Sequence, residues 1–202
     1  MHRHRPLILA SSSRYRRDLL GRLGLRFDWE SPNADETPLD HETSDSTALR
    51  LAEVKARAVA VMHPGAVVIG SDQVAACEGK YFGKPGNHAN ALAQLQMLRG
   101  RLATFSTALC VVASNLDGET TVQTDIARTL VRFRSWSDAE LETYLRIEAP
   151  YDCAGSAKAE GLGIVLLECI ASDDPTALIG LPLIRLVSIL RTLGYPLLSR
   201  PS

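Results

Sequence analysis

The chain has 202 residues, of which 46% are hydrophobic and 22% are charged, and its formal net charge is −1. A chain of this length buries on the order of 70% of its unfolded surface, so it can form a core without disulfides. The apolar fraction excludes a disordered chain. The balanced charge excludes a strongly basic nucleic-acid binder, and we expect no nucleic-acid partner.

Hydrophobic periodicity and turn residues predict alternating strands and helices. In chain order the predicted elements are a strand at 7–10, a helix that ends at Gly24, a strand near 27–29, a loop over 31–45, a helix over 47–62, a strand at 66–69, a small hairpin near 81–82, a helix over 88–98, strands over 103–114 and 119–133 joined by a hairpin turn at 115–118, a helix over 137–146, a strand over 162–170 and a helix over 182–193. Because one long hairpin interrupts the alternation, we expect an α/β fold with a mixed sheet flanked by helices. The chain has no repeat or linker, so we treat residues 1–202 as a single domain.

The four cysteines, Cys77, Cys110, Cys153 and Cys169, lack the spacing of a zinc site or a disulfide framework. We expect them to be small buried side chains in a reducing compartment. No apolar run approaches the roughly 20 residues that a membrane helix needs, and the apolar stretch after the basic N-terminus is too short for a signal peptide. These features predict a cytoplasmic protein without a membrane partner.

The first candidate site is the segment 11–17, in which three serines and three arginines follow the first predicted strand. Backbone N–H groups at a helix N-terminus and nearby guanidinium groups together favour a phosphate. The alternative is a serine cap followed by solvated arginines.

The second candidate is Lys55, which falls within the apolar stripe of the predicted helix over 47–62. A lysine there either extends its ammonium group to water or points it into a lined site.

Acidic or basic candidates are predicted on three loops. Asp72 follows the strand predicted at 66–69, where a carboxylate can hold a metal or orient an attacking water; the alternative is a turn-forming aspartate. Asp35 and Glu36 offer further metal-binding oxygens, or else belong to a solvated loop. Lys84 lies between two turn-forming residues, which is a weak signal by itself.

A set of short motifs also appears in order along the chain. They are SSSxxRR at 11–17, DE at 35–36, LAxxKA at 51–56, GSDQ at 70–73, GKP at 83–85, CAGSAKAEGLG at 153–163 and IGLPL at 179–183. In these motifs the chain resembles the Maf family of nucleoside triphosphate pyrophosphatases, and specifically its YceF-type branch, which cleaves 7-methyl-GTP. The resemblance implies a two-lobed fold with a central cleft, like that of inosine triphosphatases, and a homodimer.

The resemblance assigns roles to individual residues. It implies a phosphate-binding Ser11, a catalytic Arg16, a proton-accepting Asp72, and functional side chains at Glu36, Lys55 and Lys84. Three further positions separate the branches of the family by substrate, and here they are Tyr15, Gln73 and Glu160.

The chemistry of these three residues fits a methylated guanine. A carboxylate at Glu160 can accept hydrogen bonds from both N–H groups on the base edge, although the alternative is an ordinary surface carboxylate. The ring of Tyr15 can attract the positive charge of an N7-methylated base by a cation–π contact, and Gln73 can bond the base edge or the ribose. The branch carries proline and tryptophan instead of Arg14 and Tyr15. The family usually has glycine instead of Ala108, which predicts an altered β-turn there.

The resulting hypothesis is hydrolysis between the α- and β-phosphates, giving a nucleoside monophosphate and pyrophosphate. A divalent cation, Mg²⁺ or Mn²⁺, is expected to be held by Asp72, Glu36 and waters. Arg16, Lys55 and Lys84 would neutralise the charge that develops on the phosphates. The alternatives are a pyrophosphatase for dTTP, UTP or other modified nucleotides, and a nucleotide-binding regulator of septum formation.

Overall fold

A computed structural model describes residues 5–37, 39–115 and 119–198 of the chain. Its strands are β1 (Leu7–Ala10), β2 (Asp28–Glu30), β3 (Val67–Cys77), β4 (Lys80–Phe82), β5 (Leu102–Ser114), β6 (Thr120–Phe133) and β7 (Leu167–Ala171). Its α-helices are α1 (Arg14–Gly21), α2 (Ser44–Ala60), α3 (His88–Leu98), α4 (Asp138–Glu148) and α5 (Leu183–Thr192). The predicted elements are therefore present, with corrections to their bounds given below. Residues 116–118 of the predicted hairpin turn lie outside the described residues.

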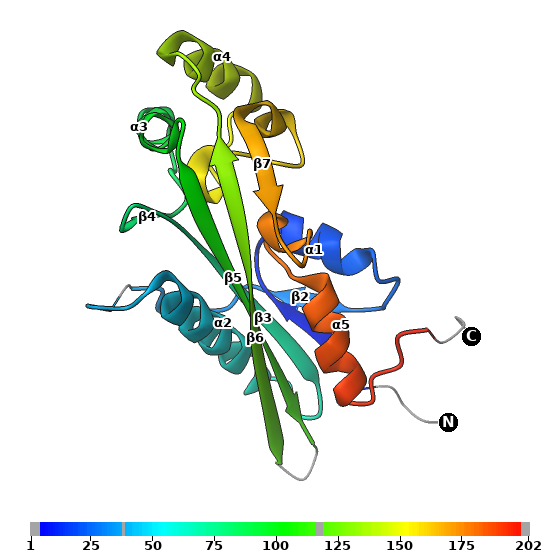
Figure 1. Ribbon diagram of the computed structural model, residues 1–202. Coiled ribbons are helices and arrows are strands. Elements are labelled where there is room, and N and C mark those ends of the chain that lie inside the picture. Colours follow the sequence, from blue (N-terminus) through cyan, green and yellow to red (C-terminus); the bar gives the residue numbers. More distant parts are fainter. Residues whose placement is uncertain (1–4, 38, 116–118, 199–202) are drawn as a thin grey trace.

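The strands form one mixed sheet, in the order β2-β1-β3-β5-β6-β7, with β4 paired to β3. Strand β1 is parallel to β2 and β3, whereas the pairs β3–β5, β5–β6 and β6–β7 are antiparallel. Helix α2 covers one face of the sheet, and α1 and α5 cover the other (Figure 1). The predicted fold class, a mixed α/β sheet flanked by helices, is confirmed.

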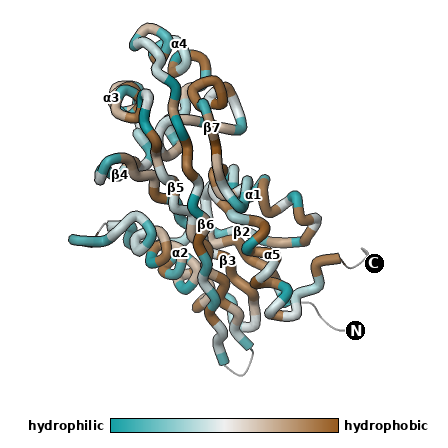
Figure 2. The backbone as a smooth tube through the Cα atoms, in the orientation of Figure 1, coloured by the Kyte–Doolittle hydropathy of each residue, from teal (hydrophilic) through white to brown (hydrophobic). Residues whose placement is uncertain are grey.

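Alternate residues of β1 serve the two faces of the sheet. Leu7 and Leu9 pack with α1 and α5, whereas Ile8 and Ala10 pack with α2. Figure 2 shows hydrophobic residues concentrated along these central strands and on α5. Since both faces are covered, these strands form continuous apolar runs rather than alternating ones.

A third apolar cluster lies at the other end of the long strands. There the start of β5 and the end of β6 pack against α3, α4 and the segment before β7, around Phe105 and Phe133. The two long strands thus run through both lobes of the molecule (Figure 1). This arrangement confirms the predicted two-lobed shape.

The structure corrects three local predictions. Helix α2 begins at Ser44 instead of residue 47, because Thr43 and Ser46 form a capping box. The apolar run 162–170 is not one strand: residues 162–166 form 3₁₀ turns, and only Leu167–Ala171 is extended. A Cβ on Gly163 would lie 2.4 Å from the backbone nitrogen of Lys158, so the chain turns tightly there. Ala108 lies inside β5, opposite Asp72, and not in a β-turn.

The cysteines are all free thiols, but their burial varies. Cys77 and Cys110 are buried as expected, whereas Cys153 is half-buried and Cys169 is exposed on β7, against expectation. None of the helices among the described residues is long and apolar enough to cross a membrane.

Helix α2 approaches β3 very closely at Gly70. A Cβ built on Gly70 would lie 2.2 Å from the carbonyl oxygen of Ala52 and 2.7 Å from the backbone nitrogen of Ala56. No real side chain tolerates such contacts, so only glycine allows the helix to lie at this distance from the strand.

Candidate active site

The site forms where strands β1 and β3 separate. Their parallel pairing ends at Ala10 and Gly70. The chain after Ala10 then turns away into α1, while β3 continues to Cys77 along β5. Asp72 is therefore in the middle of a strand, and its predicted place after a strand end is wrong. The sequence Gly70-Ser71-Asp72 resembles a turn, but the long partner β5 keeps it extended.

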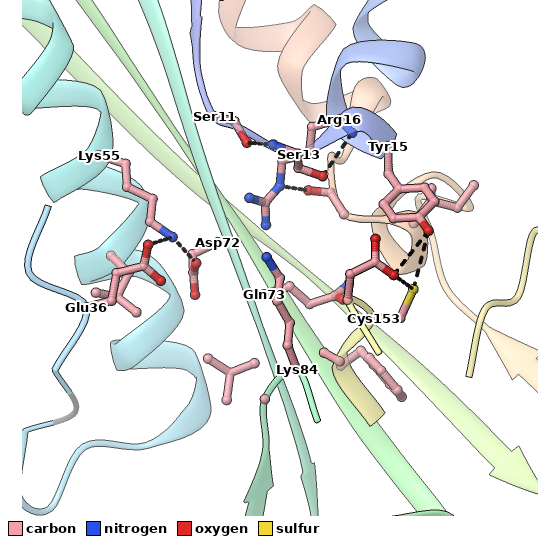
Figure 3. A pocket seen from close by; sticks show the side chains of 18 of the residues that line it. Ser11, Ser13, Tyr15, Arg16, Glu36, Lys55, Asp72, Gln73, Lys84 and Cys153 are labelled. Carbon is pink, nitrogen blue, oxygen red and sulfur yellow. Dashed lines mark hydrogen bonds and ion pairs between the residues drawn. The ribbon is translucent and has the colours of Figure 1, made fainter. Parts of the chain in front are cut away.

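The start of α1 forms the first wall of the site. Ser13 caps the helix by accepting from the backbone N–H of Arg16, and Ser11 accepts from the N–H of Ser13 at 3.1 Å. Nε of Arg16 donates to the carbonyl oxygen of Gly180 at 2.8 Å, which fixes the guanidinium group facing the cavity (Figure 3). Burial lowers the pKa of Arg16, while Asp72 and Glu36 act to raise it. The IGLPL motif thus contributes the carbonyl group that positions Arg16, a role that the sequence did not show.

Lys55 forms the charged centre of the site. Its Nζ lies 2.6 Å from Oδ1 of Asp72 and 2.9 Å from Oε1 of Glu36 (Figure 3). The Lys55 side chain is only 7% exposed, so the alternative in which it extends to water is wrong. One ammonium group therefore brings together a carboxylate from the sheet and a carboxylate from a loop.

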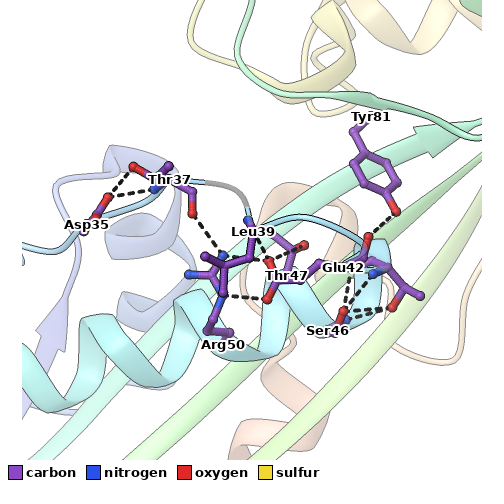
Figure 4. Close-up of polar contacts among 9 residues, drawn as sticks. Asp35, Thr37, Leu39, Glu42, Ser46, Thr47, Arg50 and Tyr81 are labelled. Atoms are coloured by element: carbon purple, nitrogen blue, oxygen red, sulfur yellow. Dashed lines mark hydrogen bonds and ion pairs between the residues drawn. The ribbon is translucent and has the colours of Figure 1, made fainter.

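Glu36 belongs to a loop that polar contacts hold in place (Figure 4). Asp35 is used locally, since its Oδ1 accepts from the backbone N–H of Thr37 at 2.9 Å and leaves Glu36 as the carboxylate that reaches Lys55. Further along, Arg50 on α2 binds both carboxylate oxygens of Glu42 at 2.6 and 2.7 Å. The hydrogen bonds from Arg50 lower the pKa of Glu42 to about 2.

Gln73 follows Asp72 on β3 and lines the same site. Its amide nitrogen bonds the hydroxyl of Thr107 at 2.9 Å and the carbonyl oxygens of Ala177 and Leu178 at 3.0 and 3.1 Å. These bonds leave the carboxamide oxygen of Gln73 as the atom that can accept from a ligand.

A second group of side chains lies at the opposite end of the site. The hydroxyl of Tyr15 is 3.4 Å from Oδ1 of Asp152, and Nζ of Lys158 lies 5.8 Å from the centre of the Tyr15 ring. Lys158 is in turn paired with Glu148 at 2.8 Å, which also accepts from the backbone N–H of Leu162. The loop that carries Glu160 is thus fixed by Glu148.

The ionisation of this second group reflects its surroundings. Burial raises the pKa of Tyr15, and the neighbouring Cys153 and Asp152 raise it further. Burial raises the pKa of Cys153 to about 12, so its thiol is protonated at neutral pH. Burial also raises the pKa of Glu160, and the negative charges of Glu148 and Asp152 add to this effect while Lys158 opposes it.

These side chains share one cavity of about 500 Å³ between the two lobes. It brings together every residue predicted for the site: Ser11, Tyr15, Arg16, Glu36, Lys55, Asp72, Gln73, Lys84 and Glu160. Lys84 reaches it from the segment that follows β4 and is exposed. The sequence reasoning did not place Asp152 or Cys153 at the cavity, although both line it. A cavity of this size is typical of sites for small molecules.

The oxygen ligands present suit a hard cation. Asp72 and Glu36 each bind Lys55 through one oxygen, so each carboxylate keeps a second oxygen that Lys55 does not use. Among the described residues no group of three or more His, Cys, Asp or Glu side chains could hold a metal ion. Two carboxylates that leave the other positions to phosphate oxygens and waters match the way in which proteins bind Mg²⁺ with nucleotides.

Comparison with known proteins identifies the family of this chain. The family described as Maf-like protein matches residues 6–193. The 7-methyl-GTP pyrophosphatase of Cupriavidus metallidurans is 59% identical over 191 residues, which cover 94% of each chain. That of Ralstonia nicotianae is 60% identical over 193 residues, which cover 95% of this chain and 97% of the other. Among solved structures, the Ham1 protein of Staphylococcus aureus aligns with 64% of this chain and 72% of its own, at 17% identity and a TM-score of 0.42. On the family match and the two pyrophosphatases, the chain belongs to the Maf family.

Proposed function

We propose that the protein hydrolyses 7-methyl-GTP to 7-methyl-GMP and pyrophosphate. The observation that carries this proposal is the single cavity in which Arg16, Lys55 and Lys84 face the carboxylate of Asp72. Three cationic groups around one carboxylate suit a triphosphate that is attacked by water. The name shared by relatives about 60% identical to this chain supports the methylated substrate.

Asp72 is the group that would accept the proton of the attacking water. Its Oδ1 is held by Lys55, which orients the carboxylate, while Oδ2 is left to take the proton. The water oxygen bonds to the α-phosphorus as the bond between that phosphorus and the bridging oxygen breaks. Pyrophosphate leaves with the bridging oxygen.

The cationic side chains would bind and stabilise the phosphates. Arg16 is fixed by the Gly180 carbonyl group, so it can meet the developing charge without rearranging. The N-terminus of α1 and the hydroxyl of Ser11 would bind the terminal phosphates. Lys84, on the opposite wall, would contact the phosphates from the side of β4.

A divalent cation, Mg²⁺ or Mn²⁺, is part of this proposal. Glu36 would hold it through the oxygen that Lys55 does not use, together with Asp72, waters and phosphate oxygens. When bound, such an ion polarises the phosphate oxygens and neutralises part of their charge.

The base would lie at the other end of the cavity. Glu160 would accept from the two N–H groups of guanine, and the oxygen of Gln73 would accept from a ribose hydroxyl or from the base. The Tyr15 ring already has the Lys158 ammonium over it, so the base would use the face that lines the cavity. We also propose, on the family resemblance, a cytoplasmic homodimer.

The test is a comparison of 7-methyl-GTP, GTP, dTTP and UTP with purified protein and Mg²⁺ or Mn²⁺, with the products separated by HPLC. We expect the highest kcat/KM for 7-methyl-GTP, pyrophosphate as the second product, and loss of activity with EDTA. Faster hydrolysis of dTTP or UTP would instead favour the other branch of substrates. Tight nucleotide binding without pyrophosphate release would favour a regulator of septum formation.

A further inference from the structure

We propose that Arg50 and Glu42 are positioning residues, whose ion pair holds Thr37 in place so that the adjacent Glu36 reaches Lys55. This inference rests on the proposed function insofar as Glu36 serves catalysis. Neither Arg50 nor Glu42 lines the cavity, so neither would touch the substrate itself.

The ion pair is well built. Nε of Arg50 lies 2.6 Å from one carboxylate oxygen of Glu42, and Nη2 lies 2.7 Å from the other. The side chains are only 25% and 15% exposed. Bidentate contacts of this kind fix the direction of both side chains, which a single lysine contact does not.

The pair is connected directly to the loop that carries Glu36. The same Nη2 of Arg50 donates to the carbonyl oxygen of Thr37 at 3.2 Å. Thr37 follows Glu36 in the chain, and its own N–H group and hydroxyl are bound by Asp35 (Figure 4). Arg50 therefore fixes the backbone beside Glu36 from one side, and Asp35 fixes it from the other.

Apolar packing does not hold Glu36 in position in the described part of the loop. Every residue of the segment 31–37 is exposed or half-exposed, so the segment has no buried side chain to anchor it. Polar contacts are then the main constraint on where Glu36 lies. Arg50 and Lys55 are both on α2, so one helix sets the position of Glu36 and also carries its partner.

The pair also reaches the opposite wall of the cavity. The hydroxyl of Tyr81, on β4, donates to the backbone carbonyl oxygen of Glu42 at 2.8 Å. Lys84 follows β4 by two residues. The contacts of Glu42 therefore connect the segment that carries Glu36 with the segment that carries Lys84.

A double-mutant cycle tests the inference. The variants are Arg50→Met, Glu36→Gln and the two combined, and Arg57→Met is the matched control. Arg57 lies on the same helix and pairs with Glu53, but on its exposed side and away from the cavity. The two measurements are kcat/KM for 7-methyl-GTP and hydrogen exchange of the backbone amides in the segment 31–37.

We expect Arg50→Met to lower kcat/KM by about 10-fold or more and to speed amide exchange in the segment 31–37, while exchange in the central strands is unchanged. The combined variant should be no more than about twofold worse than Glu36→Gln alone, because Arg50 acts through Glu36. Arg50→Lys should restore only part of the activity, and Arg57→Met should match the unmodified chain.

Losses that simply multiply in the combined variant would overturn the inference, since Arg50 would then act independently of Glu36. Unchanged exchange in the segment 31–37 would overturn it as well. If the unmodified chain hydrolyses none of the nucleotides, the proposed function fails. The exchange measurement then decides by itself whether Arg50 holds the segment.

Discussion

The two ends of the cavity are built in different ways. At the end assigned to the phosphates, Lys55 and Asp72 are buried and come from the middle of a helix and of a central strand. At the end assigned to the base, Asp152 and Glu160 lie on irregular segments near the surface. Rigid elements thus hold Lys55 and Asp72, whereas Asp152 and Glu160 lie on segments that can change without disturbing the core.

The two ends also differ in charge. Arg16, Lys55 and Lys84 surround the phosphate end, while Asp152 and Glu160 line the base end. A substrate with an anionic tail and a cationic methylated base matches this distribution. The comparison therefore predicts that changes at the phosphate end abolish turnover, whereas changes at the base end alter the choice of nucleotide.

The largest effect is expected for Asp72→Asn. An amide cannot accept the proton of the attacking water, so kcat should fall by about 10²–10⁴-fold. The isosteric side chain should leave the fold intact, which circular dichroism and the thermal unfolding midpoint can check. Near-normal turnover in a folded Asp72→Asn protein would remove this residue from the proposed mechanism.

Glu160→Gln should change selectivity more than turnover. The amide of glutamine places a donor against one of the two N–H groups of guanine, so kcat/KM for 7-methyl-GTP should fall by about 10- to 100-fold. Hydrolysis of UTP, measured in parallel, should change little. Glu168→Gln, an exposed carboxylate outside the cavity, is the control. Equal losses for both nucleotides would contradict a role for Glu160 in base recognition.

Acidification should reproduce part of the Glu160→Gln effect. Burial raises the pKa of Glu160 above its ordinary value of 4.5, so this carboxylate is protonated at a higher pH than a solvated one. The protonated form cannot accept hydrogen bonds from both N–H groups of guanine. The preference for GTP over UTP should therefore decline as the pH falls toward the raised pKa of Glu160. Glu160→Gln should remove this pH dependence; an unchanged profile in the variant would assign it to another group.

The smallest effect is expected for Tyr15→Trp. Tryptophan attracts cations more strongly than tyrosine, so the ratio of kcat/KM for 7-methyl-GTP to that for GTP should rise by about two- to fivefold. Tyr15→Leu should lower the same ratio. If both variants keep the original ratio, the ring does not contact the methylated base.

The sequence predicted the helices, most of the strands and nine residues that line the cavity, but not Asp152 or Cys153. It could not decide whether Lys55 reaches water or a site, because its partner Asp72 is 17 positions away and meets it only after the sheet has formed. The turn-like composition of Gly70-Ser71-Asp72 concealed a continuous strand, since the pairing with β5 is not visible locally. Arg50 and Glu42 belong to no motif in the sequence, and the contact of Arg50 with Thr37 depends on how the loop folds back.

The site is sensitive to substitution of Gly70, because the position of α2 on β3 depends on this glycine. The length of the Lys55 side chain suits its distance to Asp72 only because α2 rests directly on the backbone of β3. One added methyl group at Gly70 would push the helix outward and draw the ammonium group away from its carboxylate. The position that sets the distance between Lys55 and Asp72 thus bears no functional group, and an alanine scan that passes over glycines would not reveal it.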